Sequence, residues 1–134
     1  MEKSKGFLKR FIRDEAGSQT IEAIIWMPIF VTVLALVINV SLVFFDQSQM
    51  LRVVQDANRA LSMGMFQSDT DVENYVKENL AYLSDSVKAE ATVADGFVTT
   101  TVTVPALDLM PVRIPGGYFS DTKVTVVARH LLEV

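Results

Sequence analysis

The feature that most constrains this chain is a run of 23 residues without a charge, from Ala23 to Phe45. As an α-helix the run would be about 34 Å long, enough to cross a hydrocarbon core about 30 Å thick. A buried core helix is usually shorter, about 10–14 residues, and a cleavable secretory signal has an apolar region of about 7–15 residues that ends in a small-x-small site. This run ends at Phe45 and is followed directly by Asp46. It therefore predicts a membrane span that stays with the protein.

The charges on either side of the run predict its orientation. Residues 1–17 carry five basic and three acidic side chains, whereas the remainder carries seven basic and thirteen acidic ones. Only Arg52 and Arg59 follow the run closely, so the positive-inside rule places the N-terminus in the cytoplasm and residues 46–134 outside. The acidic body argues against a nucleic-acid partner. The absence of cysteine excludes disulfides, thiolate metal sites and a cysteine nucleophile.

Four residues in or beside the run are unusual for a lipid-facing helix. Glu22 stands at its entrance, where a carboxylate costs about 2–3 kcal/mol unless it has a partner or reaches headgroup water. Pro28 leaves one carbonyl without its usual donor or bends the helix. Asn39 and Ser41 are tolerated best where they face another helix, although a bond to its own backbone is an equal alternative for Ser41. We predict that Pro28, Asn39 and Ser41 take part in helix packing.

The order of features around Glu22 forms a motif. A short basic leader, Gly17, four mostly neutral residues, Glu22 and then an apolar helix resemble the class III leader of type IV pilins and pseudopilins. The resemblance implies that a prepilin peptidase cuts between Gly17 and Ser18 on the cytoplasmic side. Removing 17 of the 134 residues leaves 117, with Glu22 as the fifth. It also implies that Glu22 is a subunit-assembly contact, pairing with the new α-ammonium group of a neighbouring subunit.

A narrower resemblance rests on Glu22, Pro28, Asp46 and the stretch QDANRA at residues 55–60. Together they are similar to the TadE-like minor pseudopilins of tight-adherence (Flp-type) pili. This implies a single-pass protein of the bacterial inner membrane that functions in pilus assembly. The implied partners are the prepilin peptidase, other pilins or pseudopilins, pilus platform proteins and a separate secretion ATPase. Ala23 stands where major Flp pilins carry an aromatic residue, which argues against the main fibre subunit.

Two helical patterns follow the run. Apolar residues recur at three- and four-residue steps and predict that the first helix continues to about residue 66, with Gly64 as a stop signal. They are Met50, Leu51, Val54, Ala57, Leu61 and Met65. A second helix is predicted over residues 68–84, because acidic residues at its start complement the helix dipole and an apolar stripe follows. The stripe consists of Val72, Tyr75, Val76, Leu80 and Leu83.

Residues 87–104 carry the clearest β-pattern. Two alternating runs flank Asp95-Gly96, a favoured two-residue hairpin turn. Pairing Ala94 with Phe97, and counting outward to Val87 opposite Val104, sorts both strands into one apolar and one polar face. A correct register is expected to give this separation.

A third strand is predicted over residues 122–131, after a long proline- and glycine-containing loop at residues 105–120. The predicted fold is α+β, with a long N-terminal helix, a short second helix and a small three-stranded antiparallel sheet. The predicted organisation is a basic leader at 1–17, the transmembrane and extended helix at 18–66, and an external head at 67–134.

No catalytic, cofactor or metal-binding pattern is present in the sequence. His130 is the single histidine and has no nearby nucleophile, and there is no glycine-rich nucleotide loop. The acidic residues that begin the second helix lack the glycine and closing glutamate of a calcium loop. We therefore expect a structural component rather than an enzyme. The alternative is an uncleaved, signal-anchored accessory protein whose external domain binds a partner.

Overall fold

The computed structural model describes residues 16–133, with side chains from Gln19 onward. Most of the predicted leader, residues 1–15, lies outside the described part. The chain divides after Leu36 into two compact units. The second unit, from Val37 onward, contains the folded head together with the later part of the long helix.

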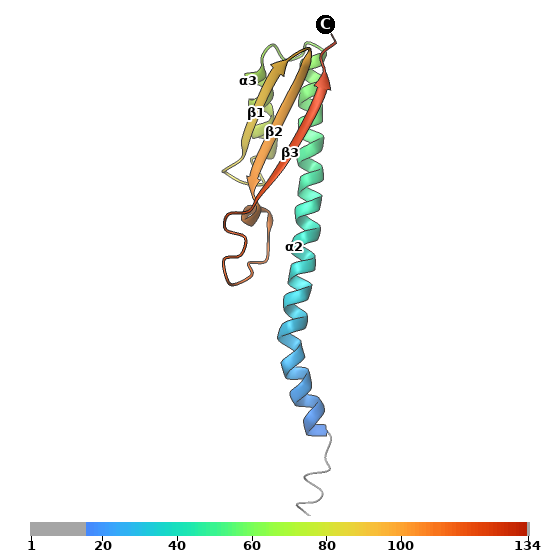
Figure 1. Ribbon diagram of the computed structural model, residues 1–134, viewed down its shortest axis with the longest axis vertical. Helices are drawn as coiled ribbons and strands as arrows, with labels where there is room; N and C mark the ends of the chain where they lie inside the picture. The colour runs from blue at the N-terminus through green and yellow to red at the C-terminus, as the bar shows by residue number, and fades with distance from the viewer. Residues whose placement is uncertain (1–15, 134) are drawn as a thin grey trace, which may run out of the picture. The chain divides into compact units, whose positions relative to one another are not determined.

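Helix α2 runs from Ala16 to Ser62, so the predicted continuation beyond the apolar run is confirmed (Figure 1). It ends in a Schellman motif, in which the Met65 N–H donates to the Ala60 carbonyl and the Gly64 N–H donates to the Leu61 carbonyl. Gly64 has φ +76°, the left-handed conformation that this motif requires. The stop signal at Gly64 therefore acts as predicted.

Helix α3 runs from Asp69 to Leu80 and begins with a capping box. The Ser68 hydroxyl accepts the Asp71 N–H, and the Asp71 carboxylate accepts the Ser68 N–H. Val72, Val76 and Leu80 form the buried stripe. The helix ends four residues before the predicted Ser84, in a turn in which the Leu83 N–H donates to the Leu80 carbonyl. The Ser84 hydroxyl donates to Asp108 and accepts the Ser86 N–H.

The strands form an antiparallel sheet in the order β1-β2-β3: β1 Lys88–Ala94, β2 Phe97–Pro105 and β3 Lys123–Leu131. The β1–β2 register is the predicted one over the seven residue pairs from Lys88–Thr103 to Ala94–Phe97. The eighth predicted pair, Val87 with Val104, lies outside the ladder, although Val87 still packs against the core. Asp95 and Gly96 both have positive φ, as a type I′ turn requires.

The core of the head lies between one face of the sheet and two helices. Buried side chains from α2, α3 and the three strands form one cluster. They include Met50, Val54 and Ala57 of α2, Val72, Val76 and Leu80 of α3, and Ala89, Ala91, Val102, Val104, Val126 and Ala128 of the sheet. The head is therefore a two-layer α+β unit, as predicted.

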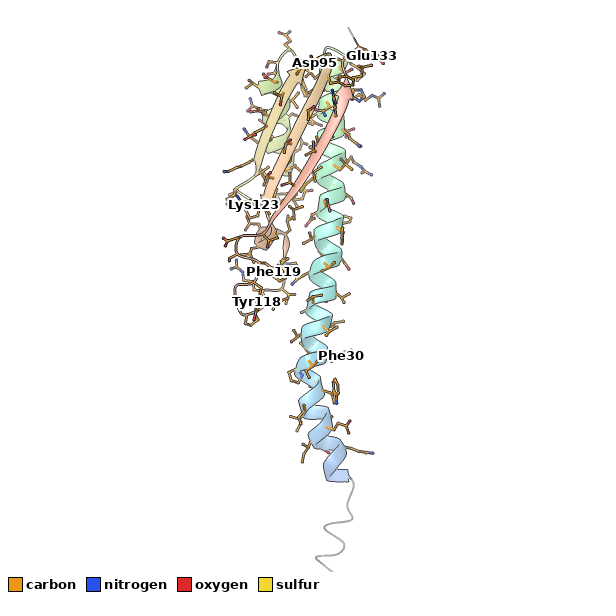
Figure 2. All side chains as sticks on the ribbon, viewed as in Figure 1. Phe30, Asp95, Tyr118, Phe119, Lys123 and Glu133 are labelled. Atoms are coloured by element: carbon orange, nitrogen blue, oxygen red, sulfur yellow. The ribbon has the colours of Figure 1, made fainter. Side chains whose placement is uncertain are left out.

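The long predicted loop contains a short 3₁₀ helix, η1, at Ala106–Leu109, followed by irregular backbone to Thr122. The Ala106 N–H donates to the Thr122 carbonyl and closes the base of the loop. Tyr118 and Phe119 lie in this loop at one end of the head, whereas the Asp95 turn lies at the opposite end of the sheet (Figure 2).

Candidate functional site in the long helix

The N-terminal part of α2 exposes its apolar side chains on every side. Trp26, Met27 and Phe30 are 59%, 66% and 67% exposed, and the smaller aliphatic residues around them are similarly uncovered. The helix is long and apolar enough to cross a membrane. In water this exposed apolar surface would be unfavourable, and it is compatible with a membrane anchor.

Glu22 lies on this surface in the second turn of α2, and its side chain is exposed. Gly17 and Ser18 lie in the first turn, so the predicted processing bond is part of the helix backbone. Ser18 and Glu22 are four residues apart and share one face of the helix. Within residues 16–133 Glu22 makes no ion pair; the ion pair found there joins Lys77 to Glu73 at 3.6 Å.

Pro28 lies inside α2 and interrupts its hydrogen bonding. The Thr32 hydroxyl donates to the Pro28 carbonyl at 2.8 Å, a bond between residues one turn apart. Ser41 makes a similar bond to the Val37 carbonyl at 2.8 Å. Such bonds satisfy a hydroxyl inside a helix without a second helix, so the packing role of Pro28 and Ser41 remains a prediction.

Asn39 has a different environment from the other polar residues of the run. It is 1% exposed, and its amide is paired with the backbone of Val112 in the loop after η1. The Asn39 Nδ2 donates to the Val112 carbonyl at 2.6 Å, and the Val112 N–H donates to the Asn39 Oδ1 at 3.1 Å. The Asn39 side chain thereby satisfies both the carbonyl and the N–H group of the Val112 backbone. Sequence reasoning found Asn39 but not its partner, which is 73 residues away.

A second buried polar group, Asn58, was not singled out from the sequence. Its Nδ2 donates to the Ala128 carbonyl at 3.1 Å, and its Oδ1 accepts the Thr100 hydroxyl at 2.6 Å. Asn58 and Thr100 are 1% and 0% exposed. The network joins α2 to strands β2 and β3 within the core. A signal was available, because position 58 falls on the same helix face as Val54 and Leu61.

Two acidic groups of the head have shifted pKa values. Hydrogen bonds from the backbone of Gln67, and then from the side chain of Ser68, lower the pKa of Asp71 from its ordinary 3.8. Partial burial raises the pKa of Asp46, which follows the apolar run. Neither group lies beside a nucleophile or a metal-ligand set: residues 16–133 contain no cluster of three His, Asp or Glu side chains able to hold a metal ion. His130 is exposed on β3.

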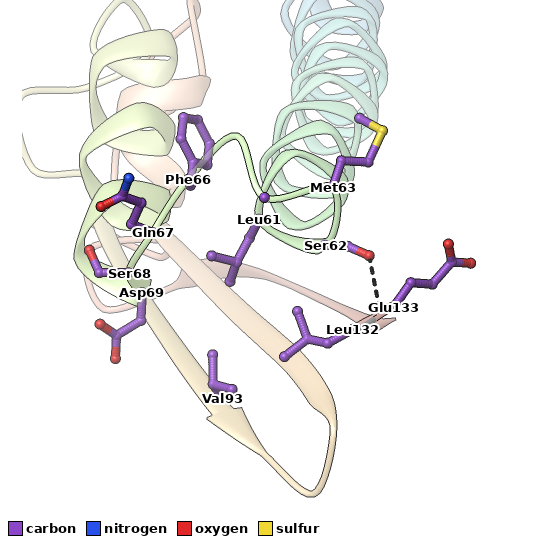
Figure 3. Close-up of a pocket in the computed structure, with 11 residues that line it drawn as sticks. Leu61, Ser62, Met63, Phe66, Gln67, Ser68, Asp69, Val93, Leu132 and Glu133 are labelled. Carbon is purple, nitrogen blue, oxygen red and sulfur yellow. Dashed lines mark hydrogen bonds between the residues drawn. The ribbon is translucent and has the colours of Figure 1, made fainter.

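A hollow of about 690 Å³ lies where α2 ends and the chain turns toward α3 (Figure 3). Its walls include Leu61, Phe66, Val93 and Leu132. On one side the Glu133 N–H donates to the Ser62 hydroxyl at 3.4 Å. The walls combine apolar side chains with two carboxylates and carry no base–nucleophile pair, so the hollow does not suggest a reaction.

In comparison with known proteins, a family match falls within helix α2. The family model described as TadE-like protein matches residues 17–59. No curated protein and no solved structure matches the chain. The matched segment begins at Gly17 and includes Glu22, Pro28, Asn39 and Ser41. The resemblance inferred from the sequence is therefore confirmed over this segment, and a TadE-like segment suggests a component associated with the tight-adherence pilus system.

Proposed function

We propose that this TadE-like chain is a single-pass inner-membrane pseudopilin that assembles into, or primes, a tight-adherence pilus. The observation that supports the proposal most directly is Glu22 at the start of an exposed apolar helix that matches the family. In the proposed organisation, residues 1–17 are a removable leader, residues 18–66 form the inserted and extended helix, and residues 67–134 form a head outside the membrane.

The exposed surface of α2 suits a helix that exchanges lipid for other helices. Lipid tails are as apolar as leucine, so helix association there depends on packing and interhelical polar contacts rather than on a hydrophobic drive. The cost of leaving lipid is consequently small when the new neighbour is another apolar helix. A pilin can thus move from membrane to fibre without refolding.

Glu22 supplies the polar contact in this proposal. Cleavage after Gly17 creates an α-ammonium group on Ser18, at the end of α2 where the helix dipole already favours a carboxylate. In surroundings of low dielectric an isolated carboxylate or ammonium is costly, whereas the pair is much less so. Glu22 of one subunit pairing with Ser18 of the next would therefore set the axial register between subunits.

Processing requires a local change in the helix. The bond between Gly17 and Ser18 lies in the first turn of α2, where helix ends fray most readily. A prepilin peptidase would bind this turn in an unwound form. Energy for assembly would come from a separate secretion ATPase acting through the platform proteins, because the chain has no nucleotide-binding loop.

The assembly role is tested by replacing Glu22 in a host that carries the rest of the pilus machinery. We expect Glu22→Ala and Glu22→Gln to leave membrane insertion intact and to abolish incorporation into sheared pili. Glu78→Ala is the matched control, because Glu78 is an exposed glutamate on α3. Normal incorporation of either Glu22 variant would refute the charge-pair mechanism.

Processing is tested separately by intact mass and N-terminal sequencing of protein expressed with the prepilin peptidase. A mature chain that starts at Ser18 supports the pseudopilin proposal. A chain that still starts at Met1 supports the alternative, an uncleaved signal-anchored accessory protein whose head binds a partner.

A further inference from the structure

The loop at residues 110–119 is held against α2 at a defined level. The pairing of Asn39 with both backbone groups of Val112 fixes the first part of the loop to the helix. Asn39 belongs to the uncharged run, yet it also belongs to the head, whose compact unit begins at Val37. Val43, one turn further along the same helix face, is partly buried against the core of the head.

This arrangement limits where the membrane can end. From Ala23, where the uncharged run begins, α2 has 16 residues before it reaches Asn39, about 24 Å of helix. With the preceding turn, which contains Glu22, the stretch is about 30 Å long, the thickness of a hydrocarbon core. The remaining seven residues of the run, 39–45, extend over about 10 Å, comparable with the depth of a headgroup layer. If the hydrocarbon core instead extended to Phe45, the irregular backbone of the loop would lie in lipid, which membranes do not tolerate.

The side chains of the loop suit a headgroup layer. Met110, Val112, Ile114, Tyr118 and Phe119 are apolar or aromatic, and Tyr118 is 79% exposed. Tyrosine is enriched at membrane interfaces because its ring is apolar and its hydroxyl is hydrated. Arg113 is exposed and long enough to reach lipid phosphates.

The backbone of the loop supports the same placement. Pro111 and Pro115 have no N–H group, which reduces the number of donors that must stay hydrated. Gly116 has φ +118°, and a Cβ at this position would collide with the Tyr118 ring. The glycine thus lets the ring lie against the backbone while most of its surface remains exposed.

We propose that the loop at residues 110–119 docks into the phospholipid headgroup layer of the outer leaflet, and that the Asn39–Val112 pairing sets the depth of α2 in the membrane. The inference rests on the proposed membrane span and adds a second contact between protein and lipid. The occupant of this surface is the bilayer that α2 itself crosses, because the helix brings the loop to that level.

Tryptophan fluorescence tests the proposal, since the chain has a single tryptophan, Trp26. The full-length Tyr118→Trp/Trp26→Phe variant is reconstituted at low protein density into phosphatidylethanolamine/phosphatidylglycerol vesicles, with plain or acyl-chain-brominated lipids. We expect the brominated lipids to quench the indole introduced at position 118 to a degree comparable with Trp26 of the unaltered chain. Val112→Trp in the same background is a second loop reporter should the indole not fit over Gly116.

The matched control is Met65→Trp/Trp26→Phe. Met65 is 70% exposed beyond the end of α2, so its reporter is expected to be quenched by aqueous iodide and not by brominated lipid. Quenching of Trp26 without quenching of either loop reporter would overturn the docking proposal and leave the membrane span intact. Failure to quench Trp26 would overturn the span, and the docking proposal with it. Shielding of the position-118 indole from both quenchers only at high protein density would indicate a second copy of the chain as the occupant, and would also overturn it.

Discussion

The buried network around Asn58 gives a prediction whose magnitude follows from its contacts. Asn58→Leu removes two hydrogen bonds and leaves the buried Thr100 hydroxyl and the Ala128 carbonyl without this partner. Leaving a buried hydrogen-bonding group without its partner costs about 1–3 kcal/mol. Two groups are affected, so we expect the free energy of unfolding to fall by about 2–6 kcal/mol. Thr100→Val leaves only the Asn58 Oδ1 without a donor and is expected to cost about 1–3 kcal/mol.

The double variant separates this mechanism from simple packing. With both Asn58→Leu and Thr100→Val present, neither partner of the 2.6 Å bond remains, so the combined loss should be about 1–2 kcal/mol smaller than the sum of the single losses. The assay is urea unfolding of the full chain in detergent micelles, followed by pulse proteolysis of the head. Thr101→Val, on the opposite face of β2, is the control and is expected to be nearly neutral. Strictly additive losses would refute the reasoning.

Three further predictions concern the ends and links of elements. Asn39→Leu removes both bonds to Val112, and we expect hydrogen exchange at the Val112 amide to accelerate at least about tenfold, measured by mass spectrometry; unchanged exchange would contradict the pairing. Gly64→Ala places a Cβ at φ +76° and should cost about 1 kcal/mol in the same urea assay, with Gly64→Asn costing less. Asp71, whose pKa is lowered on folding, stabilises the head above its ordinary 3.8, and this contribution is lost as the pH falls below 3.8 through the folded value. Asp71→Asn should therefore flatten the dependence of stability on pH in that acid range.

Local patterns predicted the fold well where they were strong. The alternation around Asp95-Gly96 gave the hairpin register, because shifting it by one residue would have turned every apolar side chain outward. Gly64 marked the end of α2, because few other residues adopt the left-handed conformation easily. The end of α3 was misplaced, since the apolar stripe continues to Leu83 while the backbone already turns after Leu80.

The polar contacts of the candidate site were less predictable, because they depend on partners that are distant in the sequence. Asn39 was noticed as a polar residue in an apolar run, but its partner Val112 lies 73 residues away and carries no distinctive chemistry. Asn58 pairs with groups 42 and 70 residues distant. Contacts that depend on tertiary folding leave little trace in local sequence, whereas the spacing from Gly17 to Glu22 is local and was recognised from the sequence.

The way α2 is fastened into the head also has a mechanical consequence. Within the head, Met50, Val54 and Ala57 are packed side by side along the helix, and Asn58 and Ser62 add bonds to Ala128 and Leu131. A tensile load along the helix axis is therefore shared by many contacts loaded in shear, which must fail together rather than one after another. Such fastening would keep the head attached to the helix under a pull along the helix axis.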